Sequence, residues 1–176
     1  MKPMPVTTPI LAALGAALAL SCLLPAAASA EPVATPEQLA APGTQTVLSL
    51  EASGVQIYEC RQDQEGKLAW ALKAPEADLY DDAGVLEIHH FAGPSWRAND
   101  GSQIEGKLLR QVPGDRPGSI AQLLLEAKSV GSDGVLSNVR FVQRLATAGG
   151  VAPAQACATA GQTGRSPYIA RYVFLK

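Results

Sequence analysis

The chain has 176 residues, of which 47% are hydrophobic and 17% are charged, and its formal net charge is −2. These values are typical of one globular domain and exclude a disordered chain. The slightly negative charge and the lack of a clustered Lys/Arg stripe exclude a surface that tracks nucleic-acid phosphates.

The first 30 residues are predicted to be a signal peptide. Lys2 precedes an uncharged apolar run over residues 10–24, and a small-x-small sequence ends at Ala30. The run is shorter than the roughly 20 residues that span a bilayer. We therefore expect cleavage after Ala30, a secreted or periplasmic protein, and no membrane span in the mature chain. A retained anchor and lipid attachment at Cys22 are the alternatives.

The mature chain keeps two cysteines, Cys60 and Cys157. An even pair in an exported protein usually forms a disulfide. The bond would close a long loop and contribute on the order of 4–5 kcal/mol to stability. One buried and one reactive thiol are the alternative. A metal site on these two residues alone is not expected, because the Cys-x-x-Cys spacing is missing.

The first half of the mature chain predicts a leader followed by strands. Residues 31–44 are rich in Pro and Ala and predict a flexible leader, so the folded domain is expected over residues 45–176. Alternating apolar residues then predict strands at three positions, and Pro75 is expected to end the last of them. These strands cover residues 46–50, 55–61 and 67–74.

A further strand is predicted over residues 85–91. Because side chains alternate along a strand, Leu86, Ile88 and His90 share one face and His89 points the other way. If Leu86 and Ile88 face the core, His90 is the buried histidine. The two histidines cannot both bind one ion through a regular strand.

The second half of the chain continues the pattern of short strands and turns. Asn-Asp-Gly at residues 99–101 predicts a hairpin turn. Strands are expected over residues 106–112, 135–145 and 168–175, whereas residues 120–130 fit either a helix or a buried strand. The whole pattern indicates an all-β, single-domain antiparallel β-sandwich or barrel with long loops.

Polar and aromatic side chains gather around the Gly-Pro pair at residues 93–94. They are His90, Ser95, Trp96, Arg97 and Asp100. Such a set is typical of a small-molecule pocket, so these five residues are the predicted ligand-binding site. The expected partner is a small extracellular ligand, such as a sugar or a cell-wall fragment. In the structural alternative, His90 is a core histidine, Trp96 is a packing residue and Asp100 forms the turn.

The motifs of familiar enzymes are missing from the sequence. There is no Gly-x-Gly-x-x-Gly, His-Glu-x-x-His or Gly-x-Ser-x-Gly sequence, and no cofactor or metal is expected. The enzyme alternative is a hydrolase or metal-dependent activity that uses His90 with Asp100 or Glu76. A third hypothesis is an envelope protein whose strands serve only interaction.

Several separate motifs together resemble one known family. They are GVQIYEC (54–60), APEA (74–77), HFAGPSW (90–96), DGS (100–102), VQR (142–144), GGVAP (149–153) and Cys157. This order is similar to that of the secreted bacterial and fungal proteins of the domain of unknown function 3455 family, over residues 43–175.

The resemblance implies a strand at residues 123–128 and supports pairing Cys60 with Cys157. It also makes His90, rather than His89, the histidine of the family pattern. The resemblance implies no activity. Some members carry a malate dehydrogenase label, which this chain does not support because the nucleotide fingerprint is missing.

Overall fold

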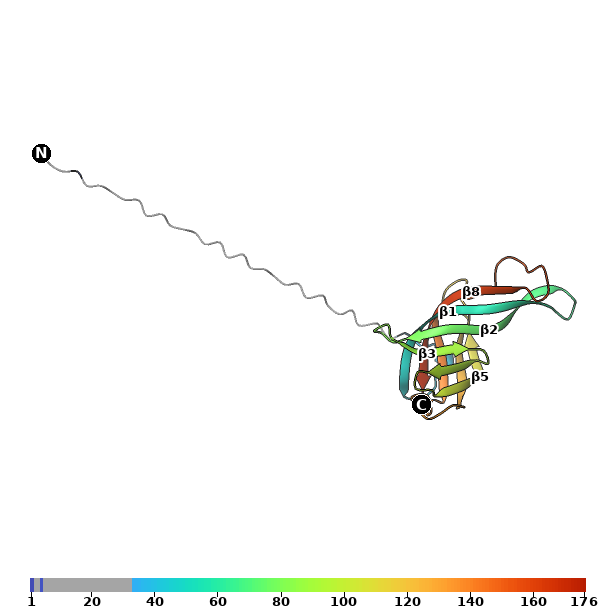
Figure 1. The fold of residues 1–176 in the computed structure, drawn as a ribbon, viewed down its shortest axis with the longest axis horizontal. Coiled ribbons are helices and arrows are strands. Elements are labelled where there is room, and N and C mark those ends of the chain that lie inside the picture. The colour runs from blue at the N-terminus through green and yellow to red at the C-terminus, as the bar shows by residue number, and fades with distance from the viewer. Residues whose placement is uncertain (2–3, 5–32) are drawn as a thin grey trace.

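Alternation of inward and outward side chains lets the strands of this chain close into a barrel. The computed structural model describes residues 1, 4 and 33–176. Within residues 33–176, eight antiparallel strands follow each other around the barrel in chain order, and β8 pairs with β1 to close it (Figure 1). The strands are β1 (Thr46–Gln62), β2 (Leu68–Tyr80), β3 (Leu86–Phe91), β4 (Ser95–Ala98), β5 (Gln103–Val112), β6 (Gln122–Ser129), β7 (Phe141–Gly149) and β8 (Thr163–Leu175).

The expected all-β antiparallel fold is confirmed, as a barrel rather than a sandwich. The signal peptide predicted over residues 1–30 lies outside the described residues, except for Met1 and Met4.

Inward-facing residues fill one end of the barrel with apolar side chains. In β8, Tyr168, Ala170, Tyr172 and Phe174 are buried, whereas Ile169 between the first two is exposed. The other strands contribute the rest of this core, which includes Leu50, Ala52, Leu79, Ile88, Ile104, Leu136, Val139 and Val142. The four residues of β8, which alternate along this strand in the sequence, therefore share the inner face of the barrel.

The two histidines of β3 lie on opposite faces, as predicted. His90 is 3% exposed and faces the interior with Ile88. His89 is exposed, and its Nδ1 lies 2.7 Å from a carboxylate oxygen of Asp78 on the outer surface.

The β3–β4 hairpin is much shorter than its neighbours and leaves a notch in the barrel wall. β2 pairs with β3 only from Ala77 onward, and β5 pairs with β4 only as far as Glu105. Residues 68–76 of β2 and 107–112 of β5 are thus strand-paired on one side only, within the described part of the chain. The turn at residues 92–94, which joins β3 to β4, borders this notch.

Pro75 does not end its strand, contrary to our expectation. β2 runs through it to Tyr80, and Pro75 pairs with Gln56 of β1. The proline is tolerated because β2 borders the notch at this position and has no second strand beside it among the described residues.

Two segments in the second half of the chain differ from, or decide between, the expected elements. Residues 122–129 form strand β6, which decides between the helix and the strand expected there. The strand expected over residues 135–145 begins only at Phe141. Residues 135–140 instead turn, and their buried Leu136 and Val139 fill the closed end of the barrel. This is why their apolar residues are three apart.

Residues 33–44, where we expected a flexible leader, lie against the outside of the barrel. The short helix η1 (Glu37–Leu39) buries Leu39 completely against Leu124 and Leu145. The carbonyl of Leu39 accepts a hydrogen bond of 2.7 Å from the Gln143 side chain. The packed part of the chain therefore begins before residue 45.

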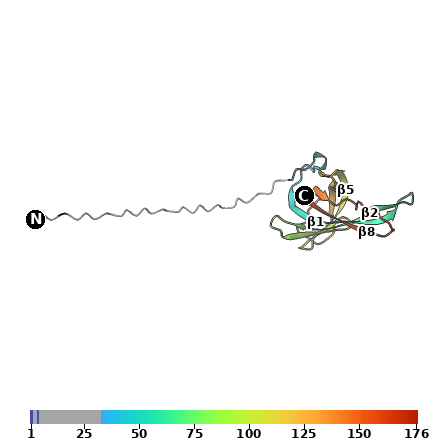
Figure 2. The same ribbon diagram turned by 90° about the horizontal axis from the view of Figure 1, so that it is seen from above.

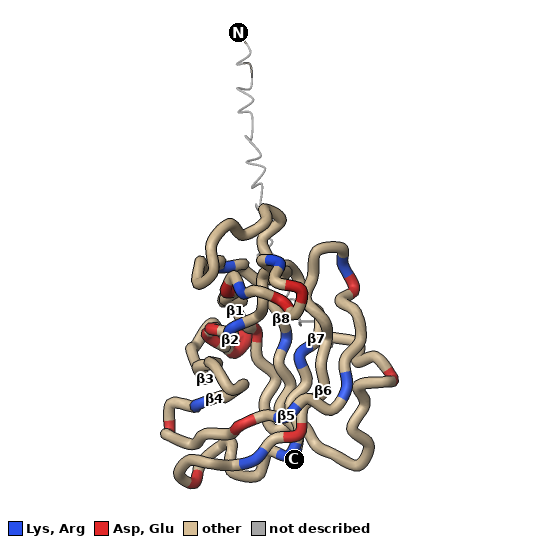
Figure 3. The backbone as a smooth tube through the Cα atoms, turned by 90° about the vertical axis from the view of Figure 1, so that its right-hand side faces the viewer, with Lys and Arg blue, Asp and Glu red and all other residues tan. Residues whose placement is uncertain are grey.

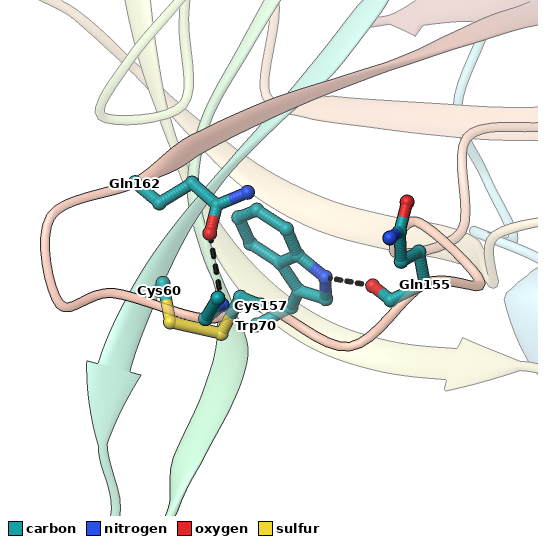
Figure 4. The surroundings of a disulfide bond; sticks show 6 residues. Cys60, Trp70, Gln155, Cys157 and Gln162 are labelled. Carbon is teal, nitrogen blue, oxygen red and sulfur yellow. Dashed lines mark hydrogen bonds between the residues drawn. A yellow bond between two sulfur atoms is a disulfide. The ribbon is translucent and has the colours of Figure 1, made fainter.

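The outer ends of β1, β2 and β8 project beyond the barrel as a three-stranded arm (Figures 1 and 2). The predicted disulfide between Cys60 and Cys157 is confirmed, with a Cα–Cα distance of 5.7 Å. It ties β1 to the loop before β8 (Figure 4). In the same loop, the Gln155 carbonyl accepts a hydrogen bond of 2.8 Å from the Trp70 indole. The arm thus holds a long loop in place without a core of its own.

Charged residues of both signs are interspersed along the described chain (Figure 3). Among the residues that the structure describes, no helix has the length and hydrophobicity needed to cross a membrane.

Candidate functional site

A cavity of about 510 Å³ occupies the end of the barrel next to the notch. All the strands contribute to its wall or its rim. The described residues around it are Gln56, Tyr58, Leu72, Lys73, Ala74, Pro75, His90, Gly93, Pro94, Trp96, Leu108, Gln111, Ile120, Ala121, Leu123, Leu125, Arg144 and Tyr172. The volume is within the range of roughly 300–1,000 Å³ for small-molecule sites, and most of these side chains are apolar.

The entrance of the cavity carries half-exposed leucines from both sides of the notch. Leu72 of β2 is 56% exposed and Leu108 of β5 is 49% exposed. Leucine side chains exposed at the rim do not stabilise the empty protein, because exposed apolar surface is unfavourable in water. These side chains would gain burial when a molecule occupies the entrance.

Stacked aromatic rings form the floor between the cavity and the core. The His90 and Trp96 rings are nearly parallel, at 5°, with centroids 4.6 Å apart. Tyr172 and Phe174 pack edge-on against the indole. Gly106 makes room for the indole, because a Cβ atom there would lie 2.8 Å from the Trp96 ring. The cross-strand pairing of His90 with Trp96 is what brings the two rings together.

His90 is held as a neutral ring with a defined tautomer. Its Nδ1 lies 2.9 Å from the carbonyl oxygen of Ser95, which can only accept, so Nδ1 carries the proton and Nε2 keeps its lone pair. Burial lowers the pKa of His90 to about 4, the Ser95 carbonyl opposes this shift, and the Arg144 charge adds to it.

Arg144 of β7 brings a positive charge to the cavity wall. Its Nε and Nη2 atoms donate hydrogen bonds of 3.1 and 2.9 Å to the carbonyl of Ala121. No Asp or Glu of the described residues forms an ion pair with it. The charge of Arg144 is therefore bound to a neutral acceptor.

Three tyrosines around Arg144 are neutral hydroxyl groups. Burial raises the pKa of Tyr58, Tyr168 and Tyr172, and the nearby Arg144 charge opposes this rise in each case. The Tyr58 hydroxyl donates a hydrogen bond of 2.8 Å to the Gly150 carbonyl. The Tyr168 and Tyr172 hydroxyl oxygens are 3.2 Å apart.

Two buried donors beside the cavity lack an acceptor among the described residues. They are Nε2 of Gln56 and Nε1 of Trp96, and each side chain is 1% exposed. Both belong to residues that line the cavity, as Arg144 does.

The structure brings together only part of the predicted ligand-binding set. His90 and Trp96 line the cavity, and Ser95 contributes its carbonyl to His90. Arg97 faces outward, with its guanidinium 5.5 Å from the centre of the Phe91 ring. Asp100 lies in the β4–β5 turn, and neither it nor Arg97 lines the cavity.

Asp100 instead holds together the closed end of the barrel. Its carboxylate accepts hydrogen bonds of 2.9 and 2.6 Å from the backbone and hydroxyl of Ser102, and one of 2.7 Å from the backbone of Val135. These hydrogen bonds lower the pKa of Asp100.

The carboxylate partners of the hydrolase hypothesis are engaged elsewhere. Glu76 pairs with Arg165 at 2.8 Å on the outer surface, and Asp100 is bound in its turn. Neither forms a hydrogen bond with His90 in the described structure. Within the same residues, no three His, Cys, Asp or Glu side chains are grouped to hold a metal ion.

Several residues of the cavity wall were not predicted from the sequence, namely Gln56, Tyr58, Arg144 and Tyr172. The alternation of β1 and β8 already placed three of them on the faces that turned out to be internal. Arg144 belongs to the VQR motif, which marked the position without showing its place in the barrel.

Fold and site define a class of protein: a small antiparallel barrel with a partly apolar interior cavity, an architecture that can hold one small ligand. The family model described as "Protein of unknown function (DUF3455)" matches residues 41–176, and the chain belongs to this family. No curated protein and no solved structure matches the chain.

Proposed function

We propose that this domain is a non-catalytic binding module that holds a small, largely apolar molecule in the mouth of its barrel. The observation that carries the proposal is the cavity of about 510 Å³, with its apolar wall and half-exposed leucine rim. The notch beside the short β3–β4 hairpin gives such a molecule a way in.

Binding is favoured over catalysis because His90 is not arranged as a general base. A base near neutral pH needs a pKa near the working pH and often a carboxylate that orients it. Burial lowers the pKa of His90 to about 4, and its Nδ1 partner is a backbone carbonyl. The stack on Trp96 also fixes the ring in the floor.

An amphipathic molecule fits this cavity better than the sugar suggested by the sequence. Sugar sites commonly offer an open aromatic face, but His90 covers one face of the Trp96 indole, and the indole itself is 1% exposed. Trp70 is engaged with the loop of the arm. The apolar wall supports a hydrocarbon or an aromatic ring system as the buried part of the ligand.

The same proposal includes export of the protein. A disulfide is typical of proteins in oxidising compartments, which supports action outside the cytoplasm. The signal sequence proposed for residues 1–30 would deliver the domain there. N-terminal sequencing of the exported protein should give Glu31 as the first residue, and a retained Met1 would contradict cleavage.

The test uses N-phenyl-1-naphthylamine, a neutral probe whose fluorescence rises in apolar surroundings. It should bind the wild-type protein saturably, at one site per chain. Leu108→Ser should weaken binding about 3- to 10-fold, because part of a leucine side chain contributes about 1 kcal/mol when it is buried. Leu109→Ser is the matched control, since Leu109 is similarly exposed (44%) but does not line the cavity.

Absence of saturable binding would remove the proposal and favour an envelope protein that serves only interaction. Equal weakening by both substitutions would place the probe outside the cavity.

A further inference from the structure

The charge around the cavity is of one sign. Of the described residues that line it, Lys73 and Arg144 carry a full charge at neutral pH, and none is Asp or Glu. The Lys73 ammonium lies 2.7 Å from the Glu59 carboxylate, which it shares with Arg61, and its side chain is 46% exposed, so water screens its charge. Arg144 is the other charge of the cavity wall.

The structure leaves Arg144 without a counter-charge. Its hydrogen bonds go to the Ala121 carbonyl, and none of the ion pairs in the described part of the chain includes it. Guanidinium groups that are partly removed from water are usually paired with an anion, because desolvation of an unpaired charge is costly. Nε and Nη2 of Arg144 already donate to the Ala121 carbonyl, so an incoming carboxylate would be bound by the remaining N–H groups of the guanidinium, through charge-assisted hydrogen bonds.

The surroundings of Arg144 add to this preference for an anion. The charge is felt at His90, Tyr58 and Tyr172, and all three are neutral at pH 7. Gln56 and Trp96, which also line the cavity, have N–H groups without an acceptor among the described residues. An incoming acceptor therefore meets a positive potential, whereas a cation would meet repulsion.

We propose that the ligand is an amphipathic carboxylate, with its anionic group against Arg144 and its apolar part extending toward Leu72 and Leu108 at the rim. This inference rests on the proposed binding function and specifies the chemistry of the ligand. It assigns to Arg144 the role of selecting an anion, and to the leucine rim the role of covering the tail.

The first experiment needs only the wild-type protein and three molecules with the same alkyl chain. Decanoate, decanol and decyltrimethylammonium are titrated below their aggregation concentrations to displace N-phenyl-1-naphthylamine. The affinity for decanoate should be at least about 10-fold higher than that for decanol, since hydrogen bonds between charged partners are the stronger ones. The cation should bind most weakly.

Equal affinity for decanoate and decanol would overturn the proposal while leaving the binding function intact. If the probe itself does not bind, the proposed function has failed and the chemistry of the ligand falls with it. The two failures are therefore distinguishable in one set of titrations.

The second experiment removes the charge. Arg144→Gln should abolish the preference for decanoate and leave decanol affinity within about 2-fold of wild type. Arg97→Gln is the matched control, because it removes an outward-facing arginine next to the cavity residue Trp96. The control should keep the full preference.

If Arg144→Gln does not fold, the wild-type comparison still decides the proposal, and Arg144→Lys should still bind decanoate more tightly than decanol. An Arg144→Gln protein that folds and still prefers decanoate would overturn the assignment.

Discussion

Replacing His90 with Phe should remove a large part of the acid sensitivity of this domain. Phe keeps a flat ring that can stack on Trp96 but cannot take up a proton. In the folded protein His90 resists protonation, with a pKa of about 4 against 6.5 for an ordinary histidine. The unfolded chain binds this proton more readily than the folded one, so folding stability is lost as the pH falls.

The window and the size of the effect follow from these two values. The contribution of His90 is fully present above about pH 6.5 and is lost as the pH falls toward 4. The gap between the two pKa values corresponds to about 3 kcal/mol, since each pH unit is about 1.4 kcal/mol. Loss of the hydrogen bond to the Ser95 carbonyl should lower the stability of the variant at pH 7 by about 1–2 kcal/mol.

The assay is urea unfolding at pH 7, 6, 5 and 4, followed by far-ultraviolet circular dichroism. Other groups such as Asp100 also lose their contribution in acid, because hydrogen bonds lower its pKa. The measured quantity is therefore the difference in pH dependence between wild type and variant, expected to be about 3 kcal/mol between pH 7 and pH 4. His89→Gln is the control and should keep the wild-type drop. An equal drop in wild type and His90→Phe would refute the reasoning.

Three further predictions concern the frame around the cavity. Replacing both Cys60 and Cys157 with Ser should lower the free energy of unfolding by up to about 4–5 kcal/mol, because the bond closes a loop of 97 residues. Dithiothreitol treatment of the wild type should cause the same loss, and a loss seen only in the variant would contradict an origin in the disulfide. Leu39→Ala should cost about 2–5 kcal/mol in a denaturant titration, since Leu39 is wholly buried, and a cost below about 1 kcal/mol would mean that the N-terminal segment is not packed on the barrel. Asp100→Asn should lower the midpoint of thermal unfolding yet leave probe affinity unchanged; weaker probe binding in a folded variant would bring this carboxylate back into the site.

The sequence predicted features that depend on neighbouring residues in one strand. The inward position of His90 followed from the two-residue period of β3. The β3–β4 hairpin puts Trp96 opposite His90, a pairing that the sequence did not predict although both residues were in the predicted site. The disulfide followed from the number of cysteines and the expected compartment.

Asp100 shows why nearness in the chain was a poor guide to the site. A strand advances about 3.3 Å per residue, so the five residues from Ser95 to Asp100 carry the chain roughly 15 Å away from the Gly-Pro turn. The predicted set therefore combined residues from opposite ends of one short strand. The strand alternation also turned Arg97 outward.

Arg144 could not be placed from the sequence for a different reason. Its position in the cavity wall depends on the pairing of β7 with both β6 and β8, and these contacts join distant parts of the chain. The alternation of β7 shows two faces without showing which is internal, because η1 covers apolar residues on the outer face as well. Only the closed barrel decides between them.

The length of the β3–β4 hairpin determines whether the interior of the barrel is accessible. The bordering edges of β2 and β5 carry Pro75, Lys73, Lys107 and Arg110, residue types that discourage a foreign strand from joining a sheet. A few added residues on each side of the turn at residues 92–94 would lengthen the hairpin between those edges and close the entrance of the cavity. The aromatic floor, the bridged arm and the other six strands would stay as they are. Insertions or deletions in this one surface turn would therefore change the size of the entrance without changing the rest of the fold.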